Sequence, residues 1–253
     1  NKLVEIDPDF EKNRFIVYGA ALLHDLGHGP LSHTSEEIFD HNHEKWSKSL
    51  IKDYSPINSI LKKFGNEIPK NIAELFSSKN LISHPMKTLI SSEIDCDRLD
   101  YLLRDSYNTG TKYGLVDLER IISALTFAPD GGIAIKPKGV IAIEHFLVLR
   151  NIMYRTIYNH RINEISSWIL ENIIKSIKNG LQDKICIDQS LFNWIFSYKD
   201  LRFEDFLAND DVMLGYHLMQ WKRQAPEPLS TLCKMFIDRD LLKATNINFL
   251  TNI

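Results

Sequence analysis

Apolar residues recur three or four positions apart along the first half of the chain, which is the period of a helix with one buried face. The pattern predicts a buried helix over residues 15–23 and a second helix that starts near Ser32 or Thr34. Further helices are predicted over residues 46–51, 72–76 and 88–107. Pro56, Pro69 and Pro85 mark the joints between these segments.

The second half of the chain has the same helical period with one interruption. Asp130-Gly131-Gly132 separates two short apolar stretches within residues 127–138, which predicts a small β-hairpin. A long helix is predicted from residue 140 to about residue 178, and Asn179-Gly180 is typical of a helix end. A last helical block covers residues 191–250, with breaks at two prolines. The chain is therefore predicted to be an all-α bundle with one hairpin.

Length and composition limit the class of protein. A chain of 253 residues can bury a large core in one or two domains, and its 44% hydrophobic and 25% charged residues are ordinary globular usage. No stretch approaches the roughly 18 apolar residues of a membrane span. The formal net charge of -3 gives no overall basic field, so nucleic acid is not an expected partner.

Cysteine usage and the first residue add two expectations. Cys96, Cys186 and Cys233 lie far apart and match neither a disulfide framework nor a zinc-finger spacing, which favours a reducing compartment and predicts a cytoplasmic protein. The chain begins at Asn1 rather than Met, and we expect it to be part of a longer protein.

The first candidate for chemistry is the run from His24 to His33, which contains three histidines and one aspartate directly after an apolar helix. Adjacent imidazole and carboxylate groups can converge on one divalent cation. A lone His-Asp pair is more often a surface pair. The glycines in this run would let the backbone approach a bound anion, which favours a site over a surface pair.

Two further stripes of polar residues lie on predicted helices. Asp97, Tyr101 and Asp105 recur every four residues, as do Arg150, Tyr154 and Tyr158, with Arg161 extending the second stripe. The acidic stripe fits a metal ligand followed by groups that bind sugar hydroxyls, and the basic stripe fits a polyanion. A solvated acidic face and arginines that lie along the surface are the alternatives, and the residues alone leave both interpretations open.

Taken together, these motifs resemble the HD-domain superfamily, and especially its deoxynucleoside triphosphate (dNTP) triphosphohydrolase branch. Residues 24–33 resemble that branch's HD-x-G-H-G-P-x-S-H run, residues 94–105 its I-D-x-D-[KR]-x-D-Y-x-x-R-D run, and residues 149–161 its arginine-and-tyrosine helix. The resemblance implies an orthogonal HD-domain helical bundle over residues 1–180. We expect residues 181–253 to be a helical extension packed on that core within the same domain.

The resemblance also implies the site residues. His24, Asp25 and Asp97 would bind one divalent metal ion, which could be Fe, Mn, Mg, Zn or Ni. The family's first metal ligand is an upstream histidine, and residues 1–23 contain none, so we expect that ligand to precede Asn1. A degenerate site that binds no metal is the alternative.

Catalytic and substrate-binding roles follow from the same resemblance. The implied reaction is attack of water on the α-phosphorus, with the cation polarising phosphate oxygens. His33 with Glu36, and His43 with Glu44, would act as proton-transfer pairs. The resemblance also implies the substrate-binding residues. The phosphates would be bound by His28, Arg98 and Arg150, and the sugar 3′-hydroxyl by Tyr101 and Asp105. Tyr158 would lie against the 2′ carbon and disfavour ribonucleotides, and Tyr154 and Arg161 are the other members of the basic stripe.

The expected activity is hydrolysis of dNTPs to deoxynucleoside and inorganic triphosphate. Alternatives are another HD nucleotide phosphohydrolase or phosphodiesterase, and a catalytically dead nucleotide-binding scaffold. Relatives of this kind assemble as dimers or tetramers, and some bind an allosteric nucleotide at a separate site, so the resemblance implies homo-oligomers and no membrane partner.

Overall fold

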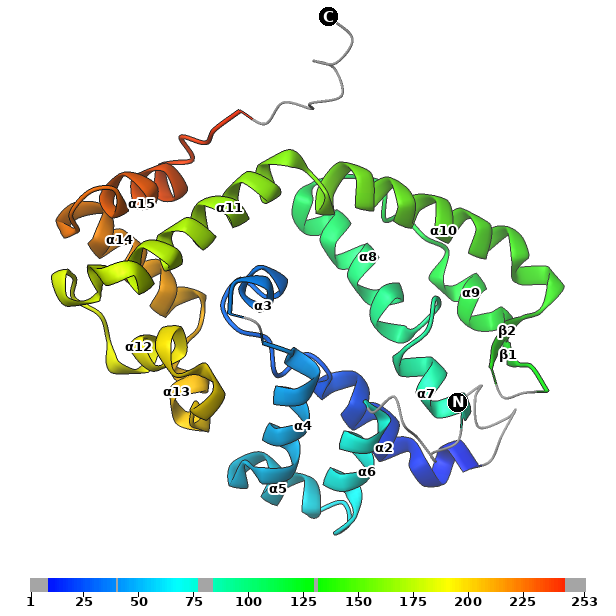
Figure 1. Ribbon diagram of the computed structural model, residues 1–253. Helices are drawn as coiled ribbons and strands as arrows, with labels where there is room; N and C mark the ends of the chain where they lie inside the picture. Colours follow the sequence, from blue (N-terminus) through cyan, green and yellow to red (C-terminus); the bar gives the residue numbers. More distant parts are fainter. Residues whose placement is uncertain (1–8, 40, 77–83, 130–131, 244–253) are drawn as a thin grey trace, which may run out of the picture. The chain divides into compact units, whose positions relative to one another are not determined.

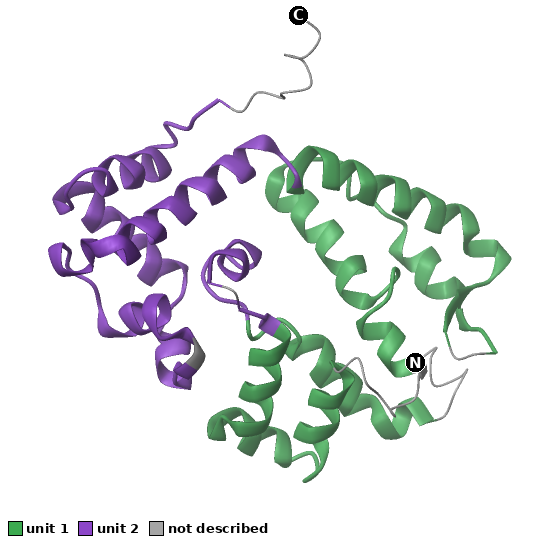
Figure 2. Ribbon diagram, viewed as in Figure 1, with its two compact units in different colours: residues 1–27, 44–158 green, residues 28–43, 159–253 purple. Residues whose placement is uncertain are grey.

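Nearly all regular structure in the chain is helical, which confirms the predicted fold class (Figure 1). The computed structural model describes residues 9–39, 41–76, 84–129 and 132–243. These residues form two compact units, unit 1 from residues 1–27 and 44–158 and unit 2 from residues 28–43 and 159–253 (Figure 2). The chain thus crosses between the units at residues 27, 43 and 158. The expected division at residue 180 stays a prediction.

Unit 1 contains two apolar clusters. The first is formed by α2, α4, α6 and α7 around Ala20, Ile51 and Ile72, all fully buried. The second is formed by α8, α9 and α10 around Leu102 and Phe146. The regular elements of this unit are α2 (Asp9–Leu23), α4 (His43–Asp53, apart from its first residue), α5 (Ser55–Lys62), α6 (Ile68–Leu75), α7 (His84–Ile90), α8 (Cys96–Thr109), α9 (Leu118–Ala124), β1 (Leu125–Phe127), β2 (Ile133–Ile135), a 3-10 turn (Pro137–Gly139), α10 (Val140–Met153) and a π-helical turn (Tyr154–Tyr158).

Several predicted elements of unit 1 are confirmed. The predicted helix over residues 15–23 corresponds to α2, which ends at Leu23, directly before the histidine-rich run. The predicted hairpin is present, with Leu125 paired to Ile135 in an antiparallel register, although its first strand starts two residues earlier than expected. Residues 130–131 of its turn lie outside the described residues.

Unit 2 packs α11, α14 and α15 against one another. Their buried residues include Ile173, Leu218 and Trp221, and the Trp194 ring of α12 stacks on the Phe206 ring of α13 with centroids 5.1 Å apart. Gly180 has a φ of 106° at the predicted helix end, a conformation that favours glycine. The elements of this unit are α3 (His33–Phe39), α11 (Arg161–Ser176), a π-helical turn (Ile177–Leu181), a 3-10 turn (Gln182–Lys184), α12 (Gln189–Phe196), a 3-10 turn (Tyr198–Asp200), α13 (Phe203–Ala208), α14 (Asp211–Gln224) and α15 (Leu229–Asp238).

The predicted continuous helix over residues 88–107 is wrong. It is interrupted between α7 and α8, because the Asp95 side chain accepts hydrogen bonds from the backbone N–H groups of Arg98 at 2.8 Å and Ser92 at 3.1 Å. A side chain that binds backbone donors in this way begins a new helix instead of continuing the old one. Asp95 is therefore the N-cap of α8.

The long helix predicted from residue 140 is also wrong as one element. It is divided into α10, a π-helical turn and α11, with a break at residues 159–160 where the His160 ring accepts from the Ile162 N–H. The predicted block over residues 191–250 is likewise divided, and Asp210 caps α14 by accepting from Met213 N at 2.8 Å. In the part of the chain that the structure describes, no helix combines the length and apolar character needed to cross a membrane.

Candidate functional site

Three predicted metal ligands of unit 1 lie together. His24 Nε2 is 3.2 Å from Asp25 Oδ2 and 3.4 Å from Asp97 Oδ1. One donor atom from each residue lies within 4.8 Å of the other two. Asp97 stands in the first turn of α8, more than 70 positions from the other two, so tertiary structure brings the group together, with α7 in contact with both α2 and α8. We call these three residues the metal group.

Backbone contacts orient the first ligand of this group. His24 Nδ1 donates to the Ala21 carbonyl at 2.9 Å, which directs Nε2 toward the two carboxylates. Ser47 of α4 is fully buried and fixes the turn that follows. Its Oγ donates to the His24 carbonyl at 2.6 Å and accepts from the Gly27 N–H at 2.8 Å. The ring of His24 is thus held by the Ala21 carbonyl, and its backbone by the Ser47 hydroxyl.

The two carboxylates change the protonation of the imidazole. Asp25, and after it Asp97, raises the pKa of His24 to about 10, against the opposing effect of burial. Without a cation, the ring therefore holds a proton at neutral pH. The protonated ring stabilises the folded chain fully below the unfolded pKa of 6.5, and this stabilisation is lost as pH rises through about 10.

The donor set fits a divalent cation. One imidazole nitrogen and two carboxylate oxygens are borderline and hard ligands, and ligand atoms that share one such ion lie about 3.0–3.4 Å apart for bonds of about 2.0–2.2 Å. The separations of 3.2 and 3.4 Å match that spacing. His24 Nε2 is also buried without a hydrogen bond of ordinary geometry among the described residues. A bound cation would take the place of the proton that this nitrogen holds between the two carboxylates.

Unit 2 holds a second group, made of His28, His33, Glu36 and His43, which we call the histidine cluster. Glu36 is its centre: its two oxygens lie 3.0 Å from His33 Nδ1 and 2.7 Å from His43 Nδ1. The His28 and His43 rings are stacked with centroids 4.1 Å apart. The structure therefore joins both predicted catalytic histidines to one carboxylate.

Hydrogen bonds keep the Glu36 carboxylate ionised. Burial alone would raise the pKa of Glu36, but the backbone N–H of His43 and the His33 and His43 side chains lower this pKa to about 2. An ionised acceptor fixes each imidazole with its Nδ1–H toward Glu36 and leaves Nε2 available for proton exchange. This arrangement is suited to general acid–base chemistry.

The turn that carries His28 and His33 is conformationally strained. Leu31 and Ser32 both adopt left-handed backbone angles, with φ of 61° and 49°. Such angles cost non-glycine residues roughly 1–2 kcal/mol each. Gly29 has a different constraint, because a Cβ there would lie 2.5 Å from the Trp194 ring. Packing against Trp194 thus accounts for this glycine, which the sequence interpretation had assigned to anion approach.

The two polar stripes of unit 1 form one cluster of side chains. Tyr158 OH donates to Asp105 at 2.7 Å, and the Tyr158 ring lies against Tyr101 and Tyr154 with centroids 5.9 and 5.0 Å apart. The Arg150 guanidinium lies 5.5 Å from the Tyr154 ring centroid. Burial, and then Asp105, raises the pKa of Tyr158, so its hydroxyl stays a donor.

Three other predicted site residues have different surroundings. Arg98 donates to Asp95 at 2.9 Å and to the Ser92 carbonyl, so its guanidinium braces the turn before α8. Arg161 is the first residue of α11 and belongs to unit 2, after the break that ends the helix carrying the stripe. Glu44 is exposed in the first turn of α4. Their functional roles stay predictions.

Sequence reasoning missed three residues around these groups. Ser47 carries no motif, and only its burial shows that it bridges two backbone groups. Glu93 pairs with Arg150 at 2.5 Å across 57 positions of sequence. His41 is buried with its ring 5.9 Å from that of Trp194, and burial lowers the pKa of this imidazole. In the sequence, the only indication of a role for His41 was the presence of two histidines within residues 41–43.

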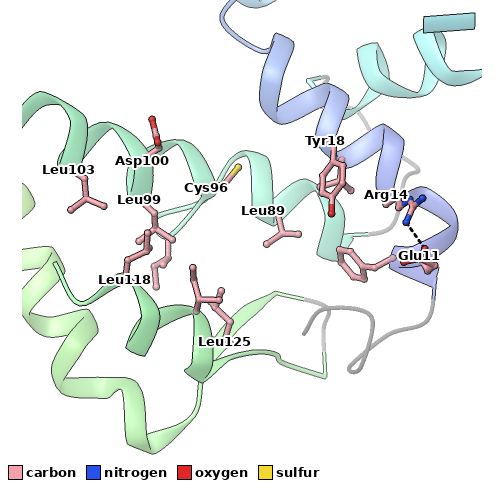
Figure 3. Close-up of a pocket in the computed structure, with 14 residues that line it drawn as sticks. Glu11, Arg14, Tyr18, Leu89, Cys96, Leu99, Asp100, Leu103, Leu118 and Leu125 are labelled. Carbon is pink, nitrogen blue, oxygen red and sulfur yellow. Dashed lines mark hydrogen bonds and ion pairs between the residues drawn. The ribbon is translucent and has the colours of Figure 1, made fainter. Parts of the chain in front are cut away.

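Unit 1 also contains an apolar pocket of about 430 Å³ (Figure 3). Side chains of α2, α7, α8 and α9 line it, among them Tyr18, Leu89 and Leu103, and a Glu11–Arg14 ion pair of 2.8 Å stands on one side. No member of the metal group is among the described residues that line this pocket. It is therefore separate from the candidate site.

Comparison with known proteins agrees with these motifs. Residues 1–105 match the family model of the HD domain, and residues 116–191 match that of the HD associated region. The chain is 35% identical over 240 residues to the uncharacterized protein YwfO of Bacillus subtilis, covering 94% of this chain and 55% of that protein. The chain therefore spans about half the length of this curated relative.

Two further proteins extend the comparison. The chain is 25% identical over 166 residues to the deoxynucleoside triphosphate triphosphohydrolase SAMHD1 homolog of Dictyostelium discoideum, covering 61% of this chain and 32% of that protein. Its fold is similar to that of a phosphohydrolase from Bacteroides thetaiotaomicron, with a TM-score of 0.77 and 28% identity, covering 90% of this chain and 57% of that one.

Proposed function

Because the chain belongs to the HD-domain superfamily of phosphohydrolases, we propose that it takes part in the metal-dependent hydrolysis of dNTPs to deoxynucleoside and inorganic triphosphate. The observation that carries the proposal is the convergence of His24, Asp25 and Asp97 within 4.8 Å. A bound divalent cation would supply charge stabilisation for the phosphoryl oxygens and activation of water.

The substrate class is supported by the polar cluster of unit 1. Tyr158 and Asp105 are joined by a 2.7 Å hydrogen bond, and the oxygens of a hydroxyl–carboxylate pair of this kind can accept a hydrogen bond from a sugar hydroxyl. Arg150 offers a guanidinium for phosphate oxygens, and Glu93 holds it in position until a substrate competes. The dNTP-hydrolysing name of a distant relative agrees with this assignment.

Proton transfer is assigned to the histidine cluster. His33 and His43 each donate from Nδ1 to Glu36, so Nε2 of either ring would give or take the proton that hydrolysis requires. Since Glu36 stays ionised above about pH 2, this orientation holds throughout the neutral range.

The test is product analysis. The protein is incubated with Mn²⁺ and each deoxynucleotide or ribonucleotide, and the products are separated by ion exchange. Inorganic triphosphate supports the proposal, pyrophosphate or monophosphate indicates another HD phosphohydrolase reaction, and no product indicates a binding scaffold. Tyr158→Ala should reduce the preference for deoxynucleotides over ribonucleotides, because the ring that excludes a 2′-hydroxyl is removed.

A matched pair of variants tests the metal group. Asp97→Asn should lower kcat/KM on the order of 10³-fold, since a metal ion contributes several kcal/mol to such reactions and 1.36 kcal/mol is tenfold in rate. Asp100→Asn makes the same change on the same helix, where Asp100 is exposed and paired with Arg104, and should leave kcat/KM unchanged. Equal effects of the two variants on kcat/KM would show that the metal group has no specific role in the reaction.

A further inference from the structure

A second pocket of unit 1 lies between α4, α5 and α6, which are neighbours in the ribbon (Figure 1). Its volume is about 520 Å³, within the range of about 300–1,000 Å³ typical of small-molecule sites. Four lysines line it: Lys48, Lys52, Lys62 and Lys70. None of the residues in the metal group or the histidine cluster is among the described residues that line it.

The charge of this pocket differs from that of the chain. Four lysines face two carboxylates, those of Asp53 and Glu74, so the lining carries two more positive than negative charges, whereas the whole chain has a formal net charge of -3. A concave surface with one dominant sign of charge concentrates the field and attracts ions of opposite sign. The pocket therefore favours an anion.

The lysines are poorly compensated by the protein itself. Among the described residues, no carboxylate oxygen lies within 4.0 Å of the ammonium groups of Lys48, Lys52 or Lys62, and Lys70 has only a long contact of 3.9 Å to the exposed Glu67. Like charges that line one pocket and have no close acidic partner repel one another. Binding of a multivalent anion would relieve that repulsion.

The pocket is built on fixed backbone. Asn58 Nδ2 donates to the carbonyls of Ile51 at 3.2 Å and Lys52 at 2.8 Å, which fixes the end of α4 to α5. Pro69 and Ala73 of α6 are buried and form its apolar floor. The conformational entropy lost on binding would then come mainly from ordering of the lysine side chains.

We propose that this pocket binds a compact polyphosphate anion carried by a small molecule, at a site distinct from the metal group. Lysine ammonium groups bind phosphate oxygens as point charges. A long nucleic-acid backbone is a poorer match, because the formal net charge of -3 gives no overall basic field for continuous phosphates.

The experiment measures lysine accessibility one residue at a time, with inorganic tripolyphosphate as the probe. The full chain is treated by reductive methylation with and without the probe, and the rate at each lysine is read by mass spectrometry. With the probe at about four times its Kd, occupancy is about 80% and the rates at Lys48, Lys52 and Lys62 fall about fivefold. The exposed Lys112, Lys138 and Lys234 are the matched controls and keep their rates.

Titration calorimetry gives a second measurement that does not depend on chemical labelling. A variant in which Lys48, Lys52, Lys62 and Lys70 are all changed to Gln should lose one tripolyphosphate site. A control variant with Gln at positions 63, 112, 138 and 234 removes the same total charge from exposed lysines and should retain that site.

Three results would overturn the proposal. They are unchanged methylation at the pocket lysines, equal slowing at the control lysines, and protection by a single-stranded oligonucleotide without protection by tripolyphosphate. Because the readout is local to these lysines and needs no hydrolysis, its failure is distinguishable from failure of the proposed enzymatic function.

Discussion

Ser47→Ala tests whether backbone bracing of His24 governs metal affinity. The substitution removes both contacts of the Ser47 hydroxyl, and the buried Gly27 N–H and His24 carbonyl lose their partner. An unsatisfied buried polar group costs about 1–3 kcal/mol, so the loss of both contacts should lower the free energy of unfolding by about 2–6 kcal/mol. The turn that holds the ligand would also loosen, and affinity for Mn²⁺ should fall about tenfold, the lower end of the effects seen for groups that orient ligands.

Ser106→Ala is the matched control within unit 1. Ser106 is also buried, accepts from the Gly114 N–H at 2.9 Å and donates to the Thr111 carbonyl at 2.9 Å, but it makes no contact with a metal-group residue among those described. Its loss should destabilise the fold by a similar amount and leave Mn²⁺ affinity unchanged.

Stability is measured by urea unfolding of each metal-free variant, and affinity by titration calorimetry with Mn²⁺ on the folded proteins. The reasoning is refuted if Ser47→Ala binds Mn²⁺ as tightly as the parent protein. It is equally refuted if Ser106→Ala weakens binding to the same extent, because general loosening of the unit would then explain the effect.

Three further predictions follow from individual contacts. Because the pKa of His24 is raised to about 10, a cation must displace a proton from the ring. Mn²⁺ affinity measured by calorimetry should therefore rise about tenfold per pH unit between about pH 7 and pH 9. An affinity that does not change with pH would contradict this prediction. The pKa of Glu36 is about 2 in the folded chain and 4.5 in the unfolded chain, so ionised Glu36 stabilises the fold above pH 4.5, and this stabilisation is lost as pH falls through about 2. Glu36→Gln should therefore reduce the fall in unfolding free energy at acid pH. An unchanged acid profile would argue against the assignment. In urea unfolding, Gly29→Ala should destabilise the chain by about 1–3 kcal/mol, because its Cβ would lie 2.5 Å from Trp194. Gly215→Ala has open space around it and should be neutral or slightly stabilising. Comparable losses of stability in the two variants would refute the packing argument.

The sequence predicted the helical class and the hairpin because period and turn residues are local signals. The end of α2 at Leu23 followed from Gly27, Gly29 and Pro30, because a cluster of glycines with a proline is unfavourable in a helix. The break before α8 was missed, since the apolar period runs through it and the competing signal is one capping contact of Asp95. Local helix propensity could not show whether Asp95 begins a new helix or continues the preceding one.

The candidate site was predictable to a similar degree. The resemblance to the HD-domain superfamily implied the ligands at positions 24, 25 and 97, whereas residue types and spacing alone left a surface pair and a solvated acidic face as alternatives. The Ser47 bridge and the Glu93–Arg150 pair were not predictable, because they depend on which helices pack together. The sharing of Glu36 by His33 and His43 was also missed, since the sequence had suggested Glu44 for the second histidine.

The contact between His24 Nδ1 and the Ala21 carbonyl has a consequence for how this helix can evolve. Every amino acid presents the same carbonyl oxygen, so substitutions at position 21 that preserve the helix would leave the imidazole turned the same way. The side chain at position 21 can then change within the limits set by the apolar cluster it packs against, while the ligand keeps its direction.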